Sequence, residues 1–132
     1  MKVVLDTNVL FSAFTAHGVC AGLYEECLFR VELFTSPQIV TEFSKILADI
    51  GKLSTAEIED VIHAVTSDAK TVEPQALPKR VCRDADDDWV IATAVVAKAD
   101  VIVTGDDDLL SLGSYERIAI LRPRDFLSLL AK

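Results

Sequence analysis

Four acidic residues, spread along the chain, are the side chains whose types could support chemistry together. They are, in chain order, Asp6, Glu42, Asp88 and Asp106. A site built from them contains no His or Cys, and such an all-oxygen site selects hard cations, of which Mg²⁺ or Mn²⁺ fit best because both bridge to phosphate. One or two such ions could activate water for in-line attack on a phosphodiester, so that no covalent nucleophile is needed.

Two of these acids belong to short acidic runs. One run is Asp84-Ala85-Asp86-Asp87-Asp88 and the other is Asp106-Asp107-Asp108. Acids at the start of a helix complement its dipole, but this role needs one or two acids and the first run has four in five positions. Because crowded like charge is unfavourable without a cation, both runs favour a metal-binding function.

Each acid also has a simpler interpretation. Asp6, next to Asn8, could be a turn residue that caps a helix. Glu42 could be a solvated residue on the flank of an apolar helix face. The Asp106 run could be a loop before a helix that starts at Leu109. The functional interpretation therefore depends on whether the fold brings these acids together.

Two predicted strands place acids at one edge of a sheet. Residues 2–5 and 101–104 are short apolar runs rich in β-branched residues, typical of buried parallel strands, and they lead into Asp6 and into Gly105-Asp106. In a parallel sheet with helices on both faces, the ligand crevice lies beyond the carboxyl ends of the strands. We therefore expect Asp6 and Asp106 to face the same crevice.

Two predicted helices carry the remaining acids. Ser36-Pro37 is an N-cap followed by proline in the first turn, and Gly51 provides a stop, so a helix is expected between them with Glu42 at the border of its apolar face. Asp88 precedes an alanine-rich, buried helix over residues 89–97, in which Trp89 is expected to be a core residue rather than a platform for base stacking. Helices in this class of fold begin at the crevice edge, so both acids can reach it.

The other predicted elements alternate in the same way, which indicates an α/β fold with a mostly parallel sheet. Asn8 or Thr7 is expected to cap a helix that begins near Val9, and Ser54 with Glu57 forms a capping box. The remaining expected elements are a helix over 21–30, strands over 31–34 and near 118–121, a loop over 73–78 and a last helix over 123–130.

Composition limits the class of protein. The 132 residues, with 51% hydrophobic residues and a mean hydropathy of +0.34, predict one globular domain over residues 1–132. No apolar run approaches the length of a membrane span, and three cysteines without a CxxC motif predict free thiols in the cytoplasm.

The net charge of −8 would normally argue against a nucleic-acid partner. Metal ions at the acidic runs could supply the missing positive charge, however. The nearest basic candidates for phosphate contacts are Lys79, Arg80, Arg83, Arg122 and Arg124, although a solvated surface role is the simpler interpretation of any one of them.

The order of these motifs resembles the PIN domain family over nearly the whole chain, and especially the short PIN proteins of toxin-antitoxin pairs related to VapC-like ribonucleases. The motifs are Leu5-Asp6-Thr7-Asn8-Val9-Leu10, Ser36-Pro37 leading to Glu42, the acidic run 84–88 before an alanine-rich helix, and Val103-Thr104-Gly105-Asp106-Asp107-Asp108-Leu109-Leu110. The resemblance implies a three-layer α/β/α sandwich with a mostly parallel central sheet and a Mg²⁺- or Mn²⁺-dependent endoribonuclease site. It also implies homodimers and a small antitoxin partner whose segment covers the cleft.

By position, the resemblance assigns Asp6 as the first acid, Glu42 as the helix acid, Asp88 as the third acid and Asp106 as the fourth. Asp84 or Asp87 could replace Asp88 under a small shift in alignment, and Asp108 could replace Asp106. The match also gives Asn8 and Thr104 a supporting role, as polar residues that order the metal ligands.

Two other functions remain possible from the sequence. A haloacid-dehalogenase-like phosphatase would use Asp6 as a covalent nucleophile, but it usually has a second acid two residues later, where this chain has Asn8. A PIN module that only binds RNA or protein is the other alternative, and the retention of all the acids argues against it. A Rossmann or P-loop nucleotide site is disfavoured because neither glycine-rich motif occurs.

Overall fold

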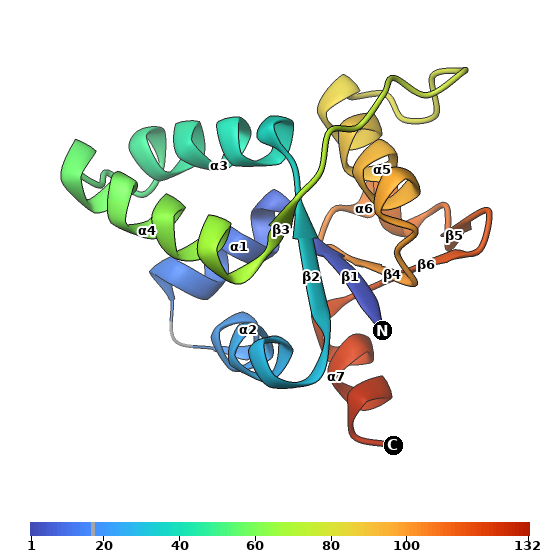
Figure 1. Ribbon diagram of the computed structural model, residues 1–132, viewed down its shortest axis with the longest axis horizontal. Helices are drawn as coiled ribbons and strands as arrows, with labels where there is room; N and C mark the ends of the chain where they lie inside the picture. Colours follow the sequence, from blue (N-terminus) through green and yellow to red (C-terminus); the bar gives the residue numbers. More distant parts are fainter. Residues whose placement is uncertain (17) are drawn as a thin grey trace.

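A six-stranded sheet forms the centre of the molecule in the computed structural model, which describes residues 1–16 and 18–132 (Figure 1). Its strand order is β3-β2-β1-β4-β6-β5, and every neighbouring pair is parallel except β5 with β6. The strands are β1 (Lys2–Leu5), β2 (Glu32–Thr35), β3 (Lys70–Thr71), β4 (Val101–Val103), β5 (Ser114–Tyr115) and β6 (Ile118–Leu121). The predicted α/β class with a mostly parallel sheet is confirmed.

Helices cover both sides of this sheet (Figure 1). The first four lie on one side and α5 lies on the other, packing against β1, β2 and β4. The helices in the described residues are α1 (Thr7–Thr15), α2 (Val19–Arg30), α3 (Pro37–Asp49), α4 (Thr55–Asp68), α5 (Ala85–Ala97), α6 (Asp107–Leu110) and α7 (Pro123–Leu130). The arrangement is the three-layer sandwich that the sequence predicts.

The two central strands bring distant parts of the chain to one sheet edge. In the register of β1 and β4, Leu5 pairs with Val103. Each strand ends there, so Asp6 and Thr104 follow in adjacent positions, and the Asp6 N–H donates to the Val103 carbonyl at 3.0 Å. Both strands are apolar and almost fully buried, because helices cover both faces of the sheet.

Local capping signals set several helix ends as predicted. Ser36 caps α3 through a bond from the Ile39 N–H to its hydroxyl, and Pro37 occupies the first turn. Ser54 and Glu57 form the predicted reciprocal capping box at the start of α4. The strand at 118–121 and the last helix at 123–130 are also confirmed.

Several predicted element ends differ from the structure. Strand β2 lies one residue later than the predicted 31–34, and β4 ends at Val103 instead of 104. Helix α1 begins at Thr7 with Asp6 as its N-cap, so the prediction of Asn8 or Thr7 as cap of a helix near Val9 was wrong. Helix α2 begins two residues before the predicted Ala21, at Val19. Helix α5 begins at Ala85 with Asp84 as its cap, which places the acidic run inside the helix rather than before it. The two-residue strands β3 and β5 were not predicted, because so short a segment carries no periodic pattern.

Trp89 does not belong to the hydrophobic core. The core residues include large side chains from β1, α3 and α5, such as Phe43 and Ile91, whereas Trp89 is half-buried and is absent from both the core and the apolar side chains packed against it. The expectation that Trp89 is a core residue was therefore wrong. Among the described residues, no helix has the length and apolar character needed to cross a membrane.

Candidate active site

Asp6 is the most strongly held acid at the sheet edge. Its side chain is 4% exposed and accepts three hydrogen bonds, from the Thr7 N–H at 2.7 Å, the Asn8 amide at 3.0 Å and the Thr104 hydroxyl at 2.7 Å. These bonds favour the charged carboxylate, but burial opposes it more strongly, so the pKa of Asp6 is raised, with a further contribution from the charge of Asp106. Asp6 is therefore a fixed carboxylate short of positive charge.

Asn8 and Thr104 join the ends of β1 and β4 around Asp6. The Thr104 hydroxyl, fully buried, donates to Asp6 and accepts from the Asp106 N–H at 2.9 Å. The Asn8 carbonyl oxygen accepts from the Gly105 N–H at 2.9 Å. A Cβ on Gly105 would lie only 3.3 Å from that oxygen, which explains why glycine suits this position. The two polar residues thus set the relative positions of Asp6 and Asp106.

Three carboxylates meet at this edge. Asp6, Asp87 and Asp106 each offer an oxygen, and these oxygens all lie within 4.8 Å of one another. Asp106 also caps the short helix α6 by accepting from the Asp108 N–H at 3.2 Å. The pKa of Asp87 is raised by burial and by its hydrogen bond to Asp106, since the two carboxylates can share a site only if a proton or a cation lies between them.

The structure places Asp87 in this cluster and Asp88 outside it. The Asp88 carboxylate accepts from the backbone N–H groups of Val81 and Cys82, at 3.1 and 2.7 Å, and so braces the loop before α5. Because α5 begins at Ala85, its buried sheet-facing stripe of Val90, Ile91 and Ala94 extends back by three residues to Asp87. From the sequence, this helix was expected to start after Asp88, which favoured Asp88 as the third acid, whereas the cluster in the structure contains Asp87.

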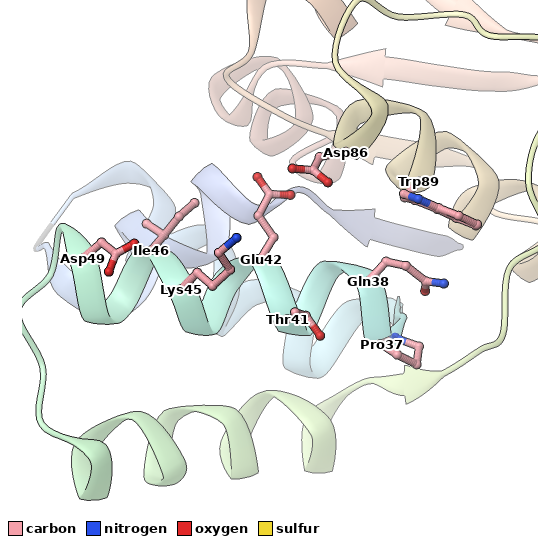
Figure 2. Close-up of a pocket in the computed structure, with 9 residues that line it drawn as sticks. All are labelled: Pro37, Gln38, Thr41, Glu42, Lys45, Ile46, Asp49, Asp86 and Trp89. Carbon is pink, nitrogen blue, oxygen red and sulfur yellow. The ribbon is translucent and has the colours of Figure 1, made fainter.

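Glu42 lies beside the cluster rather than within it. It projects from α3 toward Asp86 of α5, and the two carboxylates point toward one another across a groove (Figure 2). Partial burial, followed by the charges of Asp86 and Asp6, raises the pKa of Glu42 to about 7. The predicted position at the border of the apolar face explains this location, because Phe43 and Leu47 are buried while Glu42 reaches the groove.

The other candidate acids serve local contacts in the structure. Asp84 caps α5 by accepting from the Asp86 N–H at 2.9 Å. Asp108 forms an exposed ion pair with Arg83 at 2.7 Å. Asp84 and Asp108, named as alternates from the sequence, are therefore not part of the three-carboxylate cluster, whereas the alternate Asp87 is.

Asp86 belongs to the acidic run but was not among the candidate ligands, whereas Arg83 was named as a candidate for phosphate contacts. Asp86 faces Glu42, and Arg83 lies close enough to the site that Asp106 and Asp108 both raise its pKa. If the helix start had been placed at Ala85, its helical spacing, counted back from the buried residues, would have placed Asp86 and Asp87 in different directions from Asp88.

The donor set fits a hard divalent cation. All three clustered atoms are carboxylate oxygens, and burial together with the neighbouring carboxylates raises the pKa values of Asp6 and Asp87. The buried Thr7 hydroxyl, next to Asp6, interacts with Glu42, whose pKa it lowers, so a further oxygen lies close to the acids. These features agree with an ion that neutralises the cluster.

A comparison with known protein families identifies the family of this chain. The profile described as "PIN domain" matches residues 2–108, a span that contains every acid of the cluster. The chain belongs to the PIN domain family. PIN domain proteins are nucleases, so the carboxylate cluster lies in a fold whose members cleave phosphodiester bonds. No sequence among the curated proteins matches the chain significantly.

Solved structures show the same fold over most of this PIN domain chain. VapBC2 from Rickettsia felis, bound to a promoter DNA fragment, has a TM-score of 0.65 at 11% identity, covering 92% of this chain and 98% of its own. VapBC-1 from nontypeable Haemophilus influenzae has a TM-score of 0.63 at 14% identity, with coverage of 94% and 99%. FitAcB from Neisseria gonorrhoeae has a TM-score of 0.54 at 19% identity, with coverage of 92% and 98%. At these identities the likeness concerns the fold.

Proposed function

We propose that this PIN domain protein is a divalent-metal-dependent endoribonuclease. The observation that carries the proposal is the cluster of Asp6, Asp87 and Asp106, whose oxygens lie within 4.8 Å of one another at the carboxyl edge of the sheet. Mg²⁺ or Mn²⁺ is the proposed ion, because carboxylate and water ligands suit both and because an anionic backbone cannot approach the acids without a cation. RNA is the proposed substrate from the resemblance to VapC-like ribonucleases.

The residues divide into ligands and supports. Asp6, Asp87 and Asp106 would hold the ion, with Glu42 as the fourth acid beside them. When bound, the ion would activate the attacking water and offset the charge that builds on the phosphodiester. Asn8 and Thr104 keep Asp6 and Asp106 in place through the bonds described above. This assignment replaces Asp88 by Asp87 on geometric grounds.

We further propose that the protein is the toxin of a toxin-antitoxin pair. The structural neighbours VapBC2, VapBC-1 and FitAcB are complexes of this fold, which supports an antitoxin partner here. A homodimer follows from the same family resemblance. The cytoplasm is the proposed location, because Cys20, Cys27 and Cys82 are free thiols, as is usual in a reducing compartment.

Cleavage of single-stranded RNA tests the catalytic proposal. The wild-type protein is expected to cut RNA in Mg²⁺ or Mn²⁺ and to show no cleavage in excess EDTA. The Asp6→Asn variant should cleave at least about a hundredfold more slowly. Asparagine still caps α1, so circular dichroism should show an unchanged fold. Full activity of Asp6→Asn, or in EDTA, would contradict the proposal.

The same experiment separates the alternatives. Trapping of a phosphoenzyme on Asp6 would instead support the haloacid-dehalogenase-like phosphatase. The Asn8 amide already bonds to Asp6, and no second acid stands at that position, so we expect no such species. RNA binding without cleavage in Mg²⁺ and in Mn²⁺ would favour a non-catalytic PIN module.

A further inference from the structure

A groove between α3 and α5 leads away from the acid cluster. It has a volume of about 500 Å³, within the range of small-ligand pockets. Glu42 and Asp86 line its part nearest the cluster, and Trp89 lines it with Gln38 and Pro37 at the start of α3 (Figure 2). The groove therefore connects the proposed cleavage site to a large aromatic ring.

Trp89 is placed as a surface ring rather than as a packing residue. It is the single tryptophan of the chain, it is half-buried, and it is absent from the core and from the apolar side chains packed on it. It lines both the groove and a second hollow, of about 230 Å³. A large ring in such a position offers a face to a flat apolar partner.

The lining of the groove suits a neutral, polar ring. Three acids, Glu42, Asp49 and Asp86, outnumber the one cation, Lys45, so a phosphate group would be repelled there. A nucleobase carries no charge, and its N–H groups can donate to carboxylates while its face stacks on an aromatic ring. The Gln38 amide oxygen is buried at the same end and accepts no hydrogen bond from the described residues.

The hollow beyond Trp89 has the opposite character. Its lining includes the exposed cations Lys79 and Arg80 against the single acid Asp88. Arg80 is bonded to the carbonyl groups of Cys82 and Arg83, which holds it at this place. Along the surface, the order is an acid cluster that needs a cation, a groove for a neutral ring, and a basic hollow. That order matches phosphate, base and phosphate along a single strand, whereas a basic peptide would meet Lys79 and Arg80.

We propose that the groove is a base-binding subsite, in which one nucleobase next to the scissile phosphate of single-stranded RNA stacks on Trp89. The subsite rests on the proposed endoribonuclease function and adds a specificity-determining residue to it. Trp89 selects for the presence of a base at one position, and Glu42, Asp86 and Gln38 lie where the edge of that base would be.

Intrinsic fluorescence tests the stacking directly, because all tryptophan emission comes from Trp89. The wild-type protein is titrated with a single-stranded oligoribonucleotide of about 12 nucleotides, in Ca²⁺ so that the RNA stays intact, which a gel verifies. We expect saturable quenching by this RNA. The same RNA with its complement should quench poorly, since a paired base cannot enter the groove.

Kinetics with matched variants tests the subsite in turnover. Trp89→Leu, which keeps apolar volume without an aromatic face, should raise KM about tenfold and change kcat less than about twofold, and Trp89→Phe should recover most of the affinity. Phe29→Leu is the control, because Phe29 is 87% exposed on α2 and is not among the residues that line the groove. In a series of oligonucleotides, each with an abasic site at a different position, one member should be cleaved with the same KM by Trp89→Leu and by the wild-type protein.

Three outcomes would overturn the inference. The first is that Trp89→Leu cleaves RNA with the same KM as the wild-type protein, whichever position of the substrate is abasic. The second is that RNA binds without a change in Trp89 emission. The third is that an arginine-rich peptide quenches this emission and RNA does not. Each leaves the endoribonuclease proposal standing if wild-type RNA cleavage needs Mg²⁺ or Mn²⁺. Absence of cleavage together with saturable quenching would instead reject the nuclease and retain the base-binding groove.

Discussion

Asp87 and Asp88 are adjacent in the chain and contact different parts of the structure. Asp87 lies on the sheet-facing side of α5 with its oxygen near Asp6 and Asp106. Asp88 points to the preceding loop, where it accepts two backbone N–H groups. The turn of the helix by about 100° per residue separates their roles, which allows the two to be tested as a matched pair.

Alanine substitutions at these two positions should have opposite profiles. Asp87→Ala removes a crowded carboxylate, so we expect at least about a hundredfold loss of RNA cleavage with no loss of thermal stability. Asp88→Ala leaves the N–H groups of Val81 and Cys82 without their acceptor, so the free energy of unfolding should fall by about 1–3 kcal/mol. RNA cleavage assays and urea unfolding measure these two effects, and calorimetric Mg²⁺ titration of both variants measures ion binding. Loss of Mg²⁺ binding only in Asp88→Ala would contradict the assignment.

Thr104 is expected to act through Asp6 and Asp106 rather than on the substrate. Thr104→Val removes the hydroxyl that donates to Asp6 and accepts from the Asp106 N–H, and it should lower kcat by about 10-fold to 100-fold. Thr104→Ser restores the hydroxyl and should recover most of that loss. If the serine variant is as impaired as the valine variant while both remain folded, the hydroxyl does not position the acids.

At the scale of elements, a buried hydroxyl pair links the two helices that carry acids. The hydroxyls of Ser36, the cap of α3, and Thr93, in α5, lie 2.8 Å apart and both residues are fully buried. Helix α3 carries Glu42 and helix α5 carries Asp87. Because the pair joins the two helices, it helps to set the distance between these acids and the width of the groove that Trp89 lines.

Loss of this pair should weaken the contact between α3 and α5. Thr93→Val keeps the shape of the side chain but removes its hydroxyl contacts with Ser36 and with the Trp89 carbonyl, so the Ser36 hydroxyl keeps only the bond from the Ile39 N–H. The free energy of unfolding should therefore fall by about 1–2 kcal/mol. Thr66→Val is the matched control, because Thr66 is exposed on α4 and bonds only to carbonyl groups of its own helix. Equal urea midpoints for the two variants would show that the pair does not stabilise the α3–α5 contact.

At the scale of the whole molecule, the acidic edge should make stability depend on pH and on metal. The pKa of Glu42 rises from 4.5 to about 7 in the folded protein, and that of Asp87 is also raised. At a pH between the unfolded and the folded pKa of each group, the folded state therefore binds a proton that the unfolded state has released. This contribution is fully present below about pH 4.5 and disappears as the pH rises through about 7, so the metal-free protein loses stability across that range.

Thermal unfolding in EDTA and in Mg²⁺ measures this dependence. In EDTA, Tm should fall between about pH 5 and pH 8, and Mg²⁺ should raise Tm more at pH 8 than at pH 5, because a cation binds the deprotonated acids. The double variant with Glu42→Gln and Asp87→Asn removes both titrating groups and should flatten the profile. A Tm that rises with pH in EDTA for the wild-type protein, by contrast, would reject the assignment of these raised pKa values.

Much of the fold follows from local signals in the sequence. Residues 2–5 and 101–104 are short β-branched apolar runs, and such runs form strands wherever helices cover both faces. Ser36 with Pro37, and Ser54 with Glu57, specify helix starts through bonds that span only three residues. The parallel order of the sheet then places Asp6 and Asp106 at one edge, so the first and last acids were predictable. The assignment of residues 1–132 to one domain stays a prediction.

Tertiary structure decided the rest of the site. The acidic run at 84–88 contains several acids of equal chemistry, and only the packing of Val90 and Ile91 against the sheet selects Asp87 to face Asp6. The same packing leaves Trp89 outside the core, because its neighbour Val90 takes the buried position and the helix turns Trp89 toward the groove. Residue types along the chain thus determine that an acidic edge exists, since strand ends and caps are local properties. The particular carboxylates that meet there depend on the rotation of α5 about its axis, which contacts between distant residues fix.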